Sequence, residues 1–251
     1  MDAEQWAELL EVVVDDMQSA PHPAKAGEAS VFPLGPAPKG KIGKAARDFR
    51  SNYCEVFMRL VEACRKRGGD HDTETLEAVV RLLLALTQAV SADVRLAATL
   101  AGMELGLGIA ESLADLHAKA AISQRQLDGA RSSATVGGRG KKAADKSRKV
   151  QGLENQVERI SSAVEGLTAV SDLVYSKITQ KRYRDVSAEV RVAALSGLTK
   201  IMLALPEVYV QDKLMRYHGW SLNDKVTSVR VLALQVRRPV LSTAASCAFF
   251  F

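Results

Sequence analysis

Three similar segments, placed far apart in the chain, restrict what this sequence can fold into. Each has a polar residue, then Val-Arg, then small apolar residues, and the last two arginines lie 39 residues apart. The segments are Ser91-Ala-Asp-Val-Arg-Leu-Ala-Ala, Ser187-Ala-Glu-Val-Arg-Val-Ala-Ala and Thr227-Ser-Val-Arg-Val-Leu-Ala. A motif that returns after about 40 residues is typical of stacked helical pairs. The chain is therefore expected to form repeats.

Helical periodicity in residues 182–233 supports this expectation. Apolar residues recur every three or four positions at Val190, Ala194, Leu198, Ile201 and Leu205. Asp185, Ser187 and Asp224 are suited to capping helices, and Pro206 to opening one that ends near Gly219. Aromatic residues make up only 5% of the chain, which favours Ala/Leu helices over strands. We predict an all-α fold, a HEAT-like helical repeat solenoid.

Composition divides the chain into five regions. Residues 1–20 suit an amphipathic helix, and the Pro/Gly-rich residues 21–44 suit a linker with nothing periodic to pack. Residues 45–180 form a helical domain, with helices expected at 45–67, 73–90, 91–128 and 143–179 and a basic loop at 129–149. Residues 181–235 form the repeated domain. Residues 236–251 are an atypical tail in which Pro239 should break the last helix, and we expect a truncation there.

Catalytic and metal-binding motifs are missing from the sequence. The four histidines and three cysteines show no metal-ligand spacing, and no Gly-x-Ser-x-Gly element is present. Residues 135–142 fail the phosphate-loop pattern, because Thr135 and Lys142 replace the required glycine and hydroxyl residue. Charged residues interrupt the longest apolar region, Leu76–Leu113. We expect no enzyme, cofactor, metal, small-molecule substrate or membrane span, and the odd cysteine count indicates a reducing compartment.

The basic loop at 129–149 permits three interpretations. It is a solvated loop, a nuclear-import signal or a contact for DNA phosphates, which lysine and arginine bind without sequence preference. The candidate DNA-binding residues are Arg139, Lys141, Lys142, Lys146, Arg148 and Lys149. The apolar stripe after this loop permits a coiled-coil-like hairpin or packing against the adjacent repeat, and we expect the packing.

Several rare segments, in order, resemble the stromalin (SA, STAG or Scc3-type) subunits of cohesin. They are Asp48-Phe-Arg-Ser-Asn-Tyr-Cys-Glu, Ser123-Gln-Arg-Gln, Lys181-Arg-Tyr-Arg-Asp, Leu214-Met-Arg-Tyr-His-Gly-Trp and Asp224-Lys-Val-Thr-Ser-Val-Arg. The resemblance covers about residues 45–235 and makes 45–180 a STAG-like domain and 181–235 the stromalin conserved domain.

The resemblance implies the amino-terminal part of a non-catalytic scaffold. Such a subunit helps load and hold the cohesin ring on DNA for sister chromatid cohesion, and it works in the nucleus on chromatin. Its implied partners are the kleisin and SMC subunits, DNA and regulators that carry Phe/Tyr-x-Phe motifs. The alternative, from the repeats alone, is a generic HEAT or armadillo adaptor in transport or import.

The resemblance also implies a partner-peptide groove at Tyr183 and Trp220, with Arg184, Asp212 and Arg216 at its rim. Asp212, Arg216 and Trp220 are spaced four residues apart, which places them along one helix face. The alternative is that the two aromatic residues fill the core, as large aromatic side chains usually do.

Overall fold

The computed structural model describes Leu34 and residues 41–66, 72–135 and 141–244, with side chains placed at 44–65, 72–133 and 146–235. The expected helix at 1–20, Arg139 and the end of the tail lie outside the described residues. Every described element is a helix, so within these ranges the all-α prediction is confirmed. The elements are α2 Lys41–Lys66, α3 Thr73–Leu86, α4 Ala92–Thr135, α5 Lys141–Leu173, a π-helical turn η1 Val174–Thr179, α6 Gln180–Arg182, α7 Ala188–Ala204, α8 Pro206–Tyr209, α9 Asp212–Ser221 and α10 Thr227–Ala244.

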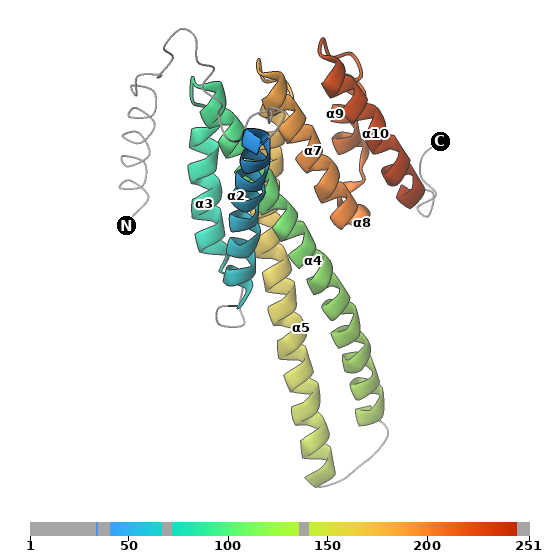
Figure 1. Ribbon diagram of the computed structural model, residues 1–251. Coiled ribbons are helices and arrows are strands. Elements are labelled where there is room, and N and C mark those ends of the chain that lie inside the picture. Colours follow the sequence, from blue (N-terminus) through green and yellow to red (C-terminus); the bar gives the residue numbers. More distant parts are fainter. Residues whose placement is uncertain (1–33, 35–40, 67–71, 136–140, 245–251) are drawn as a thin grey trace.

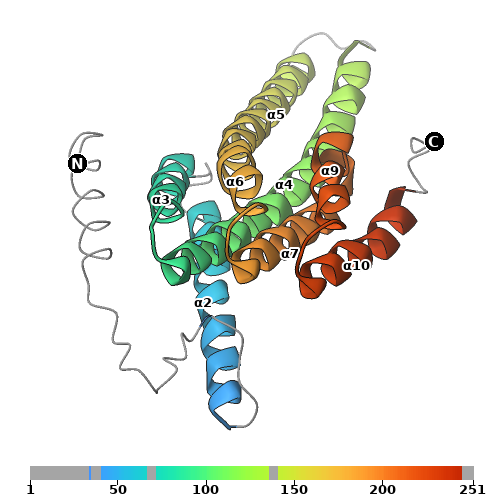
Figure 2. The same cartoon turned by 90° about the horizontal axis from the view of Figure 1, so that it is seen from above.

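The helices that carry the Val-Arg motif stack in chain order. Helix α7 contacts α4 on one side and α10 on the other, and the views in Figures 1 and 2 show these three helices in succession. Each stacked helix buries the residue before its arginine or the small residues after it, because that face meets the neighbouring helix. The motif therefore marks repeated units of a solenoid, as predicted.

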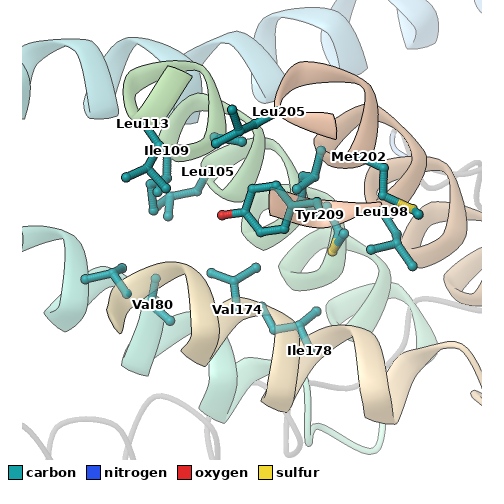
Figure 3. Packing of buried hydrophobic residues seen from close by; sticks show 14 of the residues in the cluster. Val80, Leu105, Ile109, Leu113, Val174, Ile178, Leu198, Met202, Leu205 and Tyr209 are labelled. Atoms are coloured by element: carbon teal, nitrogen blue, oxygen red, sulfur yellow. The ribbon is translucent and has the colours of Figure 1, made fainter. Parts of the chain in front are cut away.

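The core lies between α4, α7 and the end of α5. Figure 3 shows Leu105 and Ile109 of α4 facing Val174 and Ile178, with Met202 of α7 beside them. Helices α4 and α7 approach each other closely, since a Cβ at Gly197 would overlap the Met103 side chain. Within α4, an apolar stretch is long enough to cross a membrane, but 83% of it is buried inside the protein. It is a core helix.

Helices α4 and α5 also form a long hairpin that projects from the other helices (Figure 1). The basic loop was predicted at 129–149, but α4 continues to Thr135 and α5 begins at Lys141. Our preference for packing against the adjacent repeat was wrong for this part of the chain. A glycine in a helix costs only about 1 kcal/mol, and cross-helix contacts offset that cost. Arg131 Nη2 lies 2.6 Å from Glu154 Oε1, and Gln156 donates to Ser123 Oγ at 3.2 Å.

Three further expectations differ from the structure: those for the linker, for the helix opened by Pro206 and for the effect of Pro239. Leu34, within the predicted linker, is buried against Leu96 and Val190, and its carbonyl accepts a hydrogen bond from Arg50. The helix opened by Pro206 is interrupted at residues 210–211, which separates α8 from α9.

Pro239 does not break the last helix, because α10 continues to Ala244. A proline removes a single helical hydrogen bond, and the turns on both sides of Pro239 remain helical. Helix boundaries elsewhere differ by a few residues, with α2 starting at Lys41 rather than 45 and α3 ending at Leu86 rather than 90.

Candidate functional site

Charged contacts between successive repeats fix the turn that carries the predicted site. Arg95 of α4 binds both carboxylate oxygens of Asp185, with Nε–Oδ2 and Nη2–Oδ1 distances of 2.9 and 3.0 Å. Arg182 donates to the same carboxylate, and the Ser187 N–H donates to Oδ1. Burial would raise the pKa of Asp185, but these hydrogen bonds outweigh it and lower the pKa. The turn before α7 is thus held to α4.

The next junction repeats this arrangement. Arg191 of α7 binds both carboxylate oxygens of Asp224 at 2.7 and 2.8 Å, and the Val226 N–H donates to Asp224 Oδ1. The hydrogen bond from Arg191 is the main cause of the lowered pKa of Asp224. Bidentate pairs of this kind fix orientation as well as distance. The turn before α10 is therefore fixed relative to the turn before α7.

An aromatic cluster lies between these two turns. The rings of Tyr183 and Trp220 are stacked, with centroids 5.9 Å apart and planes at 28°. Tyr217 meets both rings edge-on, at 4.7 Å from Tyr183 and 5.4 Å from Trp220. The Arg184 guanidinium lies 5.0 Å from the Tyr183 centroid and 5.7 Å from that of Trp220. Such distances allow cation–π attraction.

The two predicted aromatic residues differ in exposure. Tyr183 is buried, with 7% of its surface exposed, whereas Trp220 is 49% exposed. Tyr183 therefore has the core position of our alternative interpretation, and Trp220 has an exposed ring that rests on it. A large half-exposed indole supported from below provides apolar surface for a ligand.

The exposed ring borders an open hollow of about 480 Å³. Its lining residues come from the two turns and from the end of α9: Tyr183, Arg184, Asp185, Val186, Arg191, Trp220, Ser221, Asn223, Asp224 and Lys225. The two aspartates are bound to arginines, whereas Arg184 and Lys225 form no ion pair with any described residue. The hollow therefore combines an apolar wall with two available cations.

Two predicted rim residues lie away from this hollow. Asp212 and Arg216 share helix α9 with Trp220, as their spacing indicated, and both are exposed. Arg216 Nε lies 3.5 Å from the Asp212 backbone carbonyl oxygen, and neither residue lines the hollow. The sequence prediction missed Asn223 and Lys225. The Asp224-Lys pair that opens the last of the five resembling segments was the available signal for Lys225.

The candidate DNA-binding residues that the structure describes lie near the start of α5, in the α4–α5 hairpin. Lys141 and Lys142 are in the first turn of α5. Lys146 donates to the Ser133 carbonyl at 2.6 Å, so it ties the two helices together. Arg148 and Lys149 are exposed on α5. No group of His, Cys, Asp and Glu suited to a metal ion occurs in the described part of the chain.

The protein is a stack of helical pairs that carries an aromatic hollow at an exposed turn. This architecture is that of the helical-repeat scaffolds. Comparison with known proteins gives the particular family. The STAG domain matches residues 38–155 and the stromalin conservative domain matches residues 184–248, which together make up most of the chain. The chain belongs to the stromalin family.

Individual relatives agree with this assignment. "Sister-chromatid cohesion protein 3" of Arabidopsis thaliana is 27% identical over 234 residues, which is 90% of this chain and 20% of the relative. "Cohesin subunit SA-1" of Xenopus laevis is 24% identical over 88% of this chain and 17% of its own length. The solved structure of cohesin subunit Scc3 from Z. rouxii has a TM-score of 0.65 at 18% identity, over 80% of this chain and 22% of that one. The chain thus spans about a fifth of the length of these relatives.

Proposed function

We propose that this chain is a non-catalytic scaffold of the cohesin complex, acting in the nucleus on chromatin in sister chromatid cohesion. The observation that carries the proposal is the aromatic hollow at Trp220, held between two charged junctions in a chain of the stromalin family. The names of the relatives, a sister-chromatid cohesion protein of a plant and cohesin subunits of a yeast and of Xenopus laevis, support membership of the complex. Kleisin and SMC subunits are the partners proposed for it.

The hollow fits a short partner peptide with a Phe/Tyr-x-Phe motif. An aromatic anchor would stack on the exposed face of Trp220, which is already supported by Tyr183. Arg184 and Lys225 would meet an acidic group beside the motif, since Asp185 and Asp224 are occupied by arginines. Arg216 and Asp212 would contribute only if the peptide continued along α9.

The binding test is a fluorescently labelled Phe/Tyr-x-Phe peptide titrated with the chain. We expect Trp220→Ala to weaken binding by about 2 kcal/mol or more, as for an interface hot spot, with a melting temperature close to that of the unchanged chain because the ring is half exposed. Leu203→Ala removes an exposed apolar side chain of α7 outside the hollow and is the matched control. Unchanged affinity in Trp220→Ala, or a large loss of stability, would reject the groove.

A second candidate function is sequence-independent DNA binding by the tip of the hairpin. Its support is the exposure of Arg148 and Lys149 on a projecting element. Neutralising Lys141, Lys142, Arg148 and Lys149 together should weaken duplex binding and reduce the salt slope, by about 0.9 for each DNA phosphate that is no longer neutralised. The same slope in the variant would place the DNA-binding surface elsewhere.

A pulldown from nuclear extract separates the proposed scaffold from the alternative adaptor. Recovery of cohesin ring subunits is expected. Recovery of transport receptors without them would favour the generic HEAT or armadillo adaptor.

A further inference from the structure

Three turns form one edge of the stack, and we call it the turn edge: residues 87–91 before α4, 183–187 before α7 and 222–226 before α10. Arg95 joins the first turn to the second. Its Nη1 donates to the Val90 carbonyl at 2.6 Å, while its Nε and Nη2 bind the Asp185 carboxylate. Because one guanidinium reaches both turns, they lie next to each other at the same end of the helices (Figure 1).

The second and third turns are joined by the same contacts. Arg191 Nη1 donates to the Val186 carbonyl at 3.1 Å, and its Nε and Nη2 bind Asp224. Arg230 Nη1 donates to the Lys225 carbonyl at 3.1 Å. Each turn therefore has a tip residue, five positions before the arginine, whose carbonyl is fixed. The tip residues, in the order of the stack, are Val90, Val186 and Lys225.

The two valine tips are not needed for helix entry. Val90 is 79% exposed and Val186 is 94% exposed. Each stands before a serine that directly precedes its helix, a position where an apolar residue often packs against the fourth helical residue. Here that fourth residue is an arginine, and the exposure of the valines leaves little contact with it. Their apolar surface is therefore available to a ligand.

The tips are continuous with the aromatic hollow. Val186 and Lys225 both line it, and they come from the two turns that enclose it. Val90 follows on the next turn of the row. Stacked helices lie about 8–10 Å apart, and an extended chain rises about 3.3–3.6 Å per residue. About three residues of an extended peptide would thus lead from one tip to the next.

We propose that the turn edge lengthens the hollow into a binding surface for an extended peptide, an inference that rests on the proposed function of the hollow. The ligand has an acidic residue on one side of its Phe/Tyr-x-Phe motif and aliphatic residues at every third position on the other side. Lys225 and Arg184 receive the acidic side, and Val186 and then Val90 receive the aliphatic side. The row runs along the turns rather than across a helix face, so a further unit in the stack would lengthen the row without covering it.

The experiment titrates the full chain into fluorescently labelled synthetic peptides. The core peptide has a glutamate beside a Phe-x-Phe motif. The leucine peptide adds residues on the side away from the glutamate, with leucine at the third and sixth added positions, and the serine peptide has serine there instead. Both chain directions are made, so that one of them matches the order of the tips. In that direction the leucine peptide should bind about threefold or more tightly than the serine peptide, because each leucine removes apolar surface from water.

Variants assign this gain to the valine tips. Val186→Ser should remove most of the difference between the leucine and serine peptides, and Val90→Ser a smaller part of it. Val90→Ser should leave binding of the core peptide unchanged. Val56→Ser, at a valine of α2 that is 60% exposed, is the matched control and should change neither value. All three valines are exposed, so the melting temperature should stay close to that of the unchanged chain.

The outcomes separate this inference from the proposed function. Equal affinity of the leucine and serine peptides in both directions, with the core peptide bound, would overturn the turn edge and leave the hollow. A gain that persists in Val186→Ser would also overturn it. Failure of every peptide to bind, the core peptide included, would reject the function proposed for the hollow and this inference with it.

Discussion

The two halves of α4 show what holds this protein together. In the first half, Met103, Leu105 and Ile109 have at most 1% of their surface exposed, and Arg95 binds a buried aspartate. In the second half, Leu116, Ser123 and Leu127 are the only buried residues among the side chains that the structure describes, and the cross-helix ion pair of Arg131 and Glu154 is exposed. Exposed pairs contribute at most about 1 kcal/mol, whereas breaking a buried pair costs about 3–5 kcal/mol. One continuous helix therefore has a strongly fixed end and a weakly fixed end.

The largest effect is expected at the fixed end. Asp185→Ala removes the acceptor for two arginines and an N–H, and it leaves the largely buried guanidinium groups of Arg95 and Arg182 without their carboxylate. We expect a loss of about 3–5 kcal/mol in the free energy of unfolding, measured by urea denaturation. Asp212→Ala, at an exposed residue, is the control and should change little. A loss below about 1 kcal/mol for Asp185→Ala, the range of an exposed pair, would mean that the junctions are not what fixes this end.

Acid should destabilise the contact between α9 and α7 through His218. This side chain is buried in α9 with Nε2 3.1 Å from Thr199 Oγ1, and burial lowers its pKa to about 4 from 6.5. The unfolded chain binds the proton first, so stability is intact above pH 6.5 and is lost as the pH falls toward 4. The full difference corresponds to about 3 kcal/mol.

Chemical denaturation at several pH values between about 7 and 4 measures this loss. His218→Gln should remove the pH dependence within that window, whereas retention of it in the variant would assign the dependence to another group.

The same change, glycine to alanine, made once in the core and once in the hairpin tests how differently these two parts are packed. Gly197→Ala in α7 forces a Cβ against Met103 in the core and should destabilise by about 1–3 kcal/mol. Gly129→Ala, in the hairpin half of α4, meets nothing within 4 Å and should stabilise by about 0.5–1 kcal/mol through helix propensity. The two melting temperatures should move in opposite directions. Equal shifts would show that the hairpin is packed as tightly as the core.

The sequence predicted the repeated units because their pattern is local. The Val-Arg segments and the helical spacing of apolar residues depend on neighbours within one or two turns, and both appear in α7 as expected. The hairpin was the alternative that we did not prefer, because its glycines and lysines favour a loop, while Gly129 remains helical in the structure. Contacts between distant residues, such as Arg131 with Glu154, overrode the local preference.

The site could be predicted only in part. Tyr183, Arg184 and Trp220 came from the family resemblance, and the structure places them around one hollow. The pairing of Arg191 with Asp224 brings Lys225 to the same hollow, and this pairing spans 33 residues. Spacing within a single helix correctly aligned Asp212 and Arg216 with Trp220, but it carried no information on which side of α9 the neighbouring turns would lie.

The contacts of Arg95 and Arg191 also bear on how a protein of this kind can change in length. The guanidinium groups of Arg95 and Arg191 each bind their own turn through Nη1 and the following unit through Nε and Nη2, so the contacts that join two units come from residues within those units. A unit that is copied or deleted as a whole leaves the remaining units with compatible ends. Gene duplication can therefore lengthen such a stack without new interface residues having to arise at the same time.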